Sequence, residues 1–303
     1  MFIKVAACLR WVQVNIETLS YKSLSKTVRS VLLCGMLVWL VVQTVHASEL
    51  KKQTAAAFDR YIAASEARMQ AELPNGHFLF IDGLPEERIE EAYAQLRAGQ
   101  ILVNPVNAKA QDSPIKVPGG LIHDWIGVVF IPNISLAQML AVAQDYDNYK
   151  EIYKPDVRRS RLLQRSDDDY KVYLQFYKKS LVTVVLNADY DIHYKRLGPD
   201  RVVSNSYSTR IAEVKDAGQA DERESPVDGG HGYLWRLDSY WRLEERDGGV
   251  YVQLESIGLS RSVPAVFAWL VNPLLRSIPR GALTDMLGAT RRFVAKSDLK
   301  TRP

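Results

Sequence analysis

The chain has 303 residues, 47% of them hydrophobic, and a formal net charge of +4 at pH 7. Residues 1–47 hold five Lys and Arg side chains and one Glu, a net charge of +4, so the remaining residues are about neutral. This balance argues against nucleic-acid binding, which needs clustered positive charge. Both cysteines, Cys8 and Cys34, also precede residue 48, so we expect no disulfide and no thiol chemistry in the rest of the chain.

The first predicted element is a targeting segment over residues 1–47. Basic residues precede the twelve-residue apolar run 31–42, and Val45-His46-Ala47 supplies the small or β-branched residues of a cleavage site. A positive flank, a short apolar centre and a small-residue end are typical of a signal peptide. The run is shorter than the ~20 residues that span a bilayer. We therefore expect cleavage after Ala47 and a periplasmic or secreted protein. The alternative is an uncleaved segment that anchors the chain to the inner membrane.

Residues 48–115 are predicted to form a small helical or α+β lead-in. Apolar residues recur at helical spacing over 49–72, and Pro74-Asn75-Gly76 ends that pattern. A second helix is expected over 84–98, with acidic residues in its first turn and a glycine directly after it. Residues 104–120 are rich in Pro and Gly and are predicted to be a linker.

From residue 121 the pattern predicts an antiparallel sheet. Residues 121–131 are a strongly β-type run, and Ser135 with Gln138 has the pattern of a capping box that begins a helix. Apolar and polar residues alternate from residue 157 onward. The candidate strands are 157–165, 169–179, 182–195, 201–213, 233–245 and 250–260. Asp247-Gly248-Gly249 joins the last two strands and predicts a hairpin.

The chain ends with helical sequence from Pro264 to about Lys296, which prolines interrupt at 273 and 279. An antiparallel sheet needs its apolar face covered, and this helix is the only long element available for that role. We therefore expect an α+β fold in which a curved antiparallel sheet wraps around a long C-terminal helix. A pocket remains between sheet and helix wherever side chains do not fill the space.

The stretch from Gly120 to Lys296 resembles the START-like superfamily, also called helix-grip or SRPBCC proteins. The resemblance lies in the order of elements and in the opening IHDWIGVVFIPNISLAQMLAVAQDYDNYKEIYKPDV. It implies a helix-grip domain over 120–297 with an apolar ligand between sheet and helix. Most members bind, carry or sense hydrophobic molecules, and a minority are cyclases or hydrolases. The family has no universal catalytic residue set, so the resemblance implies no catalytic residue.

Large apolar side chains are the candidate ligand contacts. In strand 233–245, alternation places Tyr233, Trp235, Leu237, Ser239, Trp241 and Leu243 on one face, which we expect to face the helix. The full set of predicted ligand-binding residues is Trp125, Tyr190, Tyr207, Trp235, Leu237, Trp241, Phe267, Trp269 and Met286. The same residue types also form ordinary filled cores, so both interpretations remain open. No metal and no cofactor is predicted; the expected partner is a hydrophobic ligand or lipid, with transient membrane contact and no nucleic acid.

Two polar sets are candidate sites of chemistry. Asp189, Asp191 and His193 share a strand face and have ligand types suited to a divalent metal, but that face is predicted to be the solvent side. His123 shares a face with Trp125, and a structural role is favoured for it over acid–base chemistry. If the chain is an enzyme, the best candidates to form an inward-facing polar pair with His123 are Tyr207, Arg210 and Glu255.

Three functions therefore remain open. The chain has no nucleophile elbow, no His-Glu-x-x-His and no phosphate-binding loop, which favours a binding protein over an enzyme. A cyclase or hydrolase acting on an apolar substrate in the same pocket is the alternative. The third function is an interaction module with a filled core, in which the lead-in provides the binding surface.

Overall fold

The computed structural model describes residues 49–106, 109–110, 113–179, 183–262 and 265–301. Within the C-terminal helix, side chains are described for 278–296 only. The predicted signal peptide at 1–47 lies outside the described residues. Ala47–Pro303 form one compact unit, so the lead-in and the sheet are described together.

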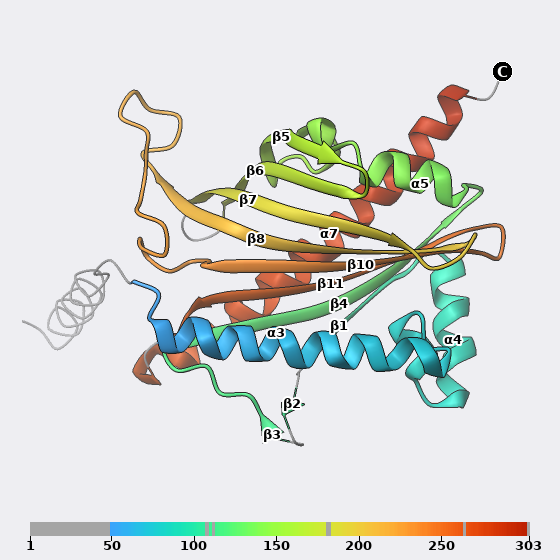
Figure 1. Cartoon of the computed structure of the whole chain (residues 1–303), viewed down its shortest axis with the longest axis horizontal. Coiled ribbons are helices and arrows are strands. Elements are labelled where there is room, and N and C mark those ends of the chain that lie inside the picture. The colour runs from blue at the N-terminus through green and yellow to red at the C-terminus, as the bar shows by residue number, and fades with distance from the viewer. Residues whose placement is uncertain (1–48, 107–108, 111–112, 180–182, 263–264, 302–303) are drawn as a thin grey trace, which may run out of the picture. The chain divides into compact units, whose positions relative to one another are not determined.

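One large antiparallel sheet dominates the structure (Figure 1). Its strands follow the order β1-β4-β11-β10-β8-β7-β6-β5, and a short ninth strand, β9, pairs with β8. The strands are β1 (Ile101–Pro105), β4 (Gly120–Pro132), β5 (Val157–Ser166), β6 (Asp169–Lys179), β7 (Thr183–Arg196), β8 (Arg201–Lys215), β9 (Arg223–Glu224), β10 (Arg236–Arg246) and β11 (Gly249–Arg261). A separate two-stranded sheet pairs β2 (Lys109–Ala110) with β3 (Ser113–Pro114). The predicted hairpin is confirmed, since Asp247 and Gly248 both have the positive φ that a tight β10–β11 turn needs.

Helices precede, interrupt and follow the sheet. They are α3 (Lys52–Glu72), η1 (Leu73–Asn75), η2 (Phe80–Gly83), α4 (Glu86–Arg97), α5 (Leu136–Ala143), η3 (Tyr146–Asn148), α6 (Tyr149–Ile152) and α7 (Ala265–Thr301). The predicted capping box is present at the start of α5, where Ser135 and Gln138 bond each other's backbone N–H groups. None of the helices in the described part of the chain is both long and apolar enough to cross a bilayer.

The C-terminal helix differs from the prediction in one respect. Interruptions were expected at Pro273 and Pro279, but α7 is assigned as one unbroken helix of 37 residues. Proline removes one N–H group and bends a helix, yet it need not end the helix when the turns on either side continue.

The sheet has two buried faces, and each carries its own hydrophobic cluster. We call the face that packs against α7 the inner face; there Val129, Ile131 and Val252 belong to one buried cluster with Leu283 and Leu287 of the helix. This arrangement of a sheet on a long C-terminal helix confirms the predicted helix-grip α+β fold.

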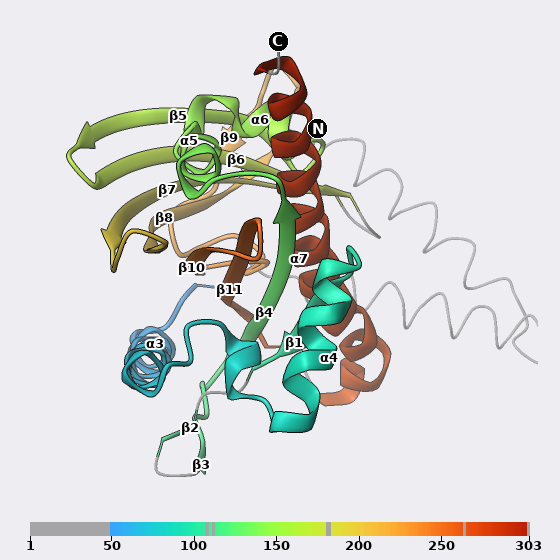
Figure 2. The same ribbon diagram turned by 90° about the vertical axis from the view of Figure 1, so that its right-hand side faces the viewer.

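We call the opposite side the outer face, and the lead-in covers part of it. Figure 2 shows α3 and α7 on opposite sides of the sheet. Phe58 and Tyr61 of α3 pack with Ile257 and Leu259 of β11, and Tyr93 of α4 packs in a further cluster of this face. The lead-in also adds β1 as an edge strand beside β4. The sequence left open whether the lead-in packs against the sheet, and the structure shows that it does.

Candidate functional site

One end of the inner face is closely packed by tyrosines. Tyr146 and Tyr194 are buried with their hydroxyl oxygens 2.8 Å apart, and Tyr153 Oη lies 3.1 Å from Thr290 Oγ1 of α7. Burial raises the pKa of Tyr153 to about 12, so its hydroxyl stays protonated. Rings and hydrogen bonds fill this end, which leaves little room for a ligand.

The adjoining part of the inner face is less completely filled. Trp125, Leu237 and Trp241 pack against the same cluster as α7, yet each is only partly buried, and so is Met286 of the helix. Large apolar side chains beneath a covering helix are normally fully buried, because a well-packed core has few voids. Their partial exposure therefore marks accessible apolar surface on the face that the helix covers.

Small residues form the floor beside these large side chains. Ser206, Ser239 and Ser256 are direct Cα partners on β8, β10 and β11. Ser256 is in turn paired with Trp125 of β4. Three serine side chains occupy less volume than three leucine side chains would, so they leave space above the strands at the centre of the inner face.

On one side of these serines, α7 approaches the sheet closely. A Cβ added to Gly127 would lie only 2.8 Å from Leu287 Cδ1, so the helix rests directly on β4 at this glycine. Trp125 lies two residues along β4 from that contact. The helix side chains that follow toward its N-terminus, including the predicted ligand contacts Phe267 and Trp269, lie outside the described residues.

The predicted ligand-binding residues divide between the two faces. Tyr190, Trp125, Leu237, Trp241 and Met286 belong to the inner face, with Tyr190 fully enclosed there. The structure therefore brings five of the predicted residues to one side of the sheet.

Trp235 and Tyr207 lie on the outer face instead, so the expectation that Trp235 faces the C-terminal helix is wrong. Trp235 precedes the first residue of β10 and sits at a bend, so the alternation of that strand does not extend to it; its ring packs with Phe58 of α3. Tyr207 donates a hydrogen bond of 2.6 Å to Glu66 Oε1 of α3.

His123 has a partner that the sequence did not suggest. Its Nε2 lies 2.8 Å from Ser260 Oγ, and Ser260 is buried on the neighbouring strand. Burial lowers the pKa of His123, so the imidazole is neutral near pH 7. Only the register of β4 on β11 reveals this pair, because 137 positions separate the two residues in the chain.

The partners suggested for His123 from the sequence are wrong. Glu255 and Tyr207 both lie on the outer face, where Arg68 binds Glu255 and Glu66 binds Tyr207. Arg210 forms an ion pair with Glu224 at the edge of the sheet.

The outer face holds a buried polar network beneath α3. Tyr61 Oη donates to Asp124 Oδ2 at 2.9 Å, and Arg68 Nη2 donates to Glu255 Oε1 at 2.5 Å. Burial, and next the negative charge of Glu255, raise the pKa of Asp124 to about 8. Asp124 therefore keeps its proton near neutral pH, which removes the repulsion between two adjacent buried carboxylates.

Arg242 continues this network from β10. Its guanidinium donates to the backbone oxygens of Phe78 at 2.8 Å and of Met69 at 3.0 Å, and it lies 2.8 Å from Glu72 Oε2. Glu72 also accepts a hydrogen bond from Arg68, so the two arginines share it. These groups are paired with one another, which indicates that they attach α3 to the sheet.

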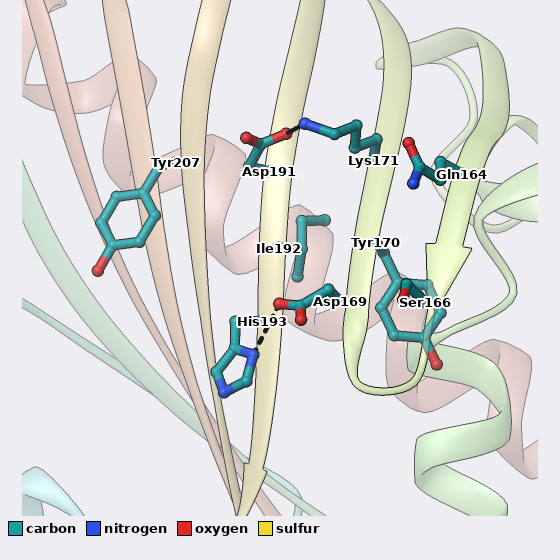
Figure 3. A pocket seen from close by; sticks show the side chains of 9 residues that line it. All are labelled: Gln164, Ser166, Asp169, Tyr170, Lys171, Asp191, Ile192, His193 and Tyr207. Carbon is teal, nitrogen blue, oxygen red and sulfur yellow. Dashed lines mark hydrogen bonds and ion pairs between the residues drawn. The ribbon is translucent and has the colours of Figure 1, made fainter.

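A hollow of about 310 Å³ lies over β6 and β7, and Asp191 and His193 of the candidate metal set line it, whereas Asp189 does not (Figure 3). There His193 Nδ1 lies 2.8 Å from Asp169 Oδ1, and Lys171 Nζ lies 2.9 Å from Asp191 Oδ1. These side chains reach solvent and pair across strands, as expected for the open side of a sheet. Within the described ranges, no cluster of three or more His, Cys, Asp and Glu side chains could hold a metal.

Comparison with known proteins bears on the fold alone. No family model matches the sequence, and no curated protein does. Among solved structures, the chain is similar to a STAR-related lipid transfer protein from Xanthomonas axonopodis (19% identity, 62% of this chain and 98% of that chain, TM-score 0.38). It is also similar to human STARD10 (10%, 72% and 84%, 0.40) and to the Zhui aromatase/cyclase from Streptomyces sp. R1128 (12%, 58% and 95%, 0.38).

These identities are low and the TM-scores are modest. The likeness concerns the arrangement of sheet and helix alone. It assigns neither an activity nor a ligand, so a function has to be argued from the chain's own side chains.

Proposed function

We propose that this chain binds a hydrophobic small molecule, a lipid in the simplest case, between the inner face of the sheet and α7. The observation that carries the proposal is the partial exposure of Trp125, Leu237, Trp241 and Met286 on the face that the helix covers. In a binding protein such surface is covered by the ligand. In a protein with a filled core it would be covered by protein.

Apolar burial can supply the affinity. An aromatic side chain buries about 150–250 Å² when fully covered. Removal of apolar surface from water contributes roughly 25 cal/mol per Å², so two half-covered tryptophans and a methionine can contribute several kcal/mol. No covalent step and no cofactor is needed for this mode of binding.

We also propose that the chain acts outside the cytoplasm, as a periplasmic or secreted protein. The pattern of residues 1–47 supports this, with a basic flank, a short apolar core and small residues at Ala47. N-terminal sequencing of the protein from a fractionated cell is the test. A first residue of Ser48 in the soluble envelope fraction supports export, and an intact N-terminus in the membrane fraction means an uncleaved anchor.

Native mass spectrometry tests the binding proposal. The mature protein is purified from the envelope fraction, its mass is recorded under native and denaturing conditions, and released molecules are extracted and identified. An apolar molecule that is released on denaturation supports the proposal. A mass equal to the bare chain, unchanged after incubation with extracted envelope lipids, contradicts it.

An enzyme of the hydrolase kind is the second candidate, and one observation favours it. His123 Nε2 and Ser260 Oγ lie within hydrogen-bond distance, which is the geometry of a base beside a nucleophile. A fluorophosphonate probe distinguishes the two functions. Labelling of Ser260 that disappears in Ser260→Ala supports the enzyme, and an unlabelled wild-type protein that still binds lipid supports simple binding.

A further inference from the structure

A row of three hydroxyl groups crosses the centre of the inner face. Ser206, Ser239 and Ser256 stand side by side on β8, β10 and β11, since Ser239 is the Cα partner of both others. Ile192 extends the row on one side and Trp125 on the other. We call Ser206, Ser239 and Ser256 the serine row. It divides an otherwise apolar face and lies beside the partly buried tryptophans.

The hydroxyls of this region lack partners. Across the described ranges, none of the three serine side chains of the row has a hydrogen bond, although Ser206 is only 7% exposed. Tyr190, on the same face of the next strand, is 4% exposed, and its hydroxyl is fully buried without a partner. Buried polar groups in folded proteins are nearly always hydrogen-bonded, so the Tyr190 hydroxyl calls for water or for a ligand's polar atom, and the serine hydroxyls beside it are free to bind one.

At the described positions of the inner face, no charged side chain borders the serine row, and the nearby carboxyl of Asp238, which helps to raise the pKa of Tyr190, belongs to the outer face of β10. The neighbouring positions of the inner face along β10 and β11 are Trp241 and Leu254 on one side and Leu237 and Gly258 on the other. On β4 the next inner-face residue is His123, which burial keeps neutral. A charged group would lose its hydration here without an opposite charge, whereas a hydroxyl or carbonyl would lose little and gain hydrogen bonds.

We infer that the ligand carries an uncharged oxygen group, a hydroxyl or a carbonyl, which hydrogen-bonds to the serine row while its apolar part lies against Trp125 and Trp241. The inference rests on the proposed function and narrows it, because it excludes both plain hydrocarbons and ligands whose charged group is buried. The serine hydroxyls both donate and accept, so they fit an alcohol as well as a ketone or an ester.

Three probes of equal chain length test the inference: cetyl alcohol, hexadecane and palmitate, each delivered from cyclodextrin. Binding is measured by the change in tryptophan fluorescence, since Trp125 and Trp241 border the row. We expect cetyl alcohol to bind about tenfold more tightly than either of the other two, the gain of about one well-made hydrogen bond.

The triple variant S206A/S239A/S256A removes three oxygens and leaves the side-chain volumes nearly unchanged. Its affinities for cetyl alcohol and hexadecane should agree within about twofold, because the substitutions remove only the hydrogen bonds to the alcohol. Ser166→Ala, at the exposed end of β5, is the matched control and should keep the full preference. If the triple variant melts early, S239A/S256A, at the two partly buried positions, replaces it.

The outcomes separate the inference from the function on which it rests. Equal binding of alcohol and hexadecane by the wild-type protein, or a preference that survives the triple substitution, overturns the role of the serine row. Palmitate as the tightest probe overturns the uncharged ligand. Failure of the wild-type protein to bind any of the three contradicts the proposed function itself.

Discussion

The two faces of the central strands are built from alternate residues of the same sequence, yet they differ in kind. On β4 and β11 the outer face presents Asp124 and Glu255, while the inner face presents Trp125 and Ser256 directly beside them. The outer groups are charged or polar, buried and bonded to α3. The inner groups are apolar or small and only partly buried.

This contrast shows that buried charge need not mark a site of chemistry. Most polar groups of the outer network bond to other groups of the protein and so hold α3 in place, and within the described residues Asp124 Oδ1 and Arg68 Nε are its buried atoms without a hydrogen bond. The inner face has apolar surface and hydroxyl groups without such partners, which is the pattern expected of a binding surface. The predictions below separate the two roles by changing one face at a time.

The largest effect is expected on the outer face, for Arg242→Ala. Removal of this guanidinium takes one of its two arginine partners from Glu72 and leaves the backbone oxygens of Phe78 and Met69 without this donor, and breaking a buried ion pair costs about 3–5 kcal/mol. Urea unfolding measures the loss. Arg88→Ala, at an exposed position of α4, is the control and should change stability by less than about 0.5 kcal/mol. Equal effects of the two substitutions would contradict a structural network.

Two adjacent residues of α7 provide a comparison on the inner face. Leu287 is fully buried against Gly127, so Leu287→Ala should cost about 3 kcal/mol of stability. Met286 is partly buried, so Met286→Ala should cost about 1 kcal/mol and instead weaken the binding of an apolar ligand. Thermal unfolding and fluorescence titration measure the two effects. A ligand affinity that follows stability in both variants would argue against a site at Met286.

A smaller effect is predicted for the pH dependence of stability, and it arises from Asp124. Its pKa is about 8 in the folded protein, well above the usual value for Asp, so the folded chain binds the extra proton. Stability from this group is therefore complete below about pH 4 and declines as the pH rises toward 8, by at most about 1.4 kcal/mol per pH unit. The groups that act on it are Glu255 on β11 and Tyr61 and Arg68 on α3, while Glu72 and Arg242 act on Glu255.

Asp124→Asn should remove this part of the pH dependence. The amide cannot ionise, so the variant should lose less stability than the wild-type protein between pH 6 and pH 8 in urea titrations. Asp168→Asn, in the exposed β5–β6 turn, is the matched control. Parallel pH profiles for the wild-type protein and Asp124→Asn would show that Asp124 does not carry the proton.

The sequence predicted the fold because the fold depends on local signals. Period-two alternation, the Asp247-Gly248 turn and the apolar helix at the end of the chain each report their own element. The inner face follows from alternation in the same way. The burial of the outer face does not follow from alternation, because Arg242 and Glu255 alternate as solvent-facing residues do. They are buried because α3 packs over them.

The details of the site depend on pairing across strands. Ser206, Ser239 and Ser256 stand far apart in the chain, and only the register sets them in one row. The prediction for Trp235 is wrong because β10 begins at Arg236, three residues after the predicted start at Tyr233, so Trp235 lies outside the alternation of the strand. A signal for the outer network was present in α3, where Tyr61, Arg68 and Glu72 recur at helical spacing and so share a face.

Photo-crosslinking with a cetyl alcohol that carries a diazirine on its alkyl chain tests the central claim, that ligand lies on the inner face. After irradiation, the labelled peptides are identified by mass spectrometry, with unlabelled cetyl alcohol as competitor. We expect labels that the competitor reduces on the peptides that contain Trp125, Trp241 and Met286. Labels confined to the outer face around Trp235 and Phe58, or labels that the competitor does not reduce, would contradict it.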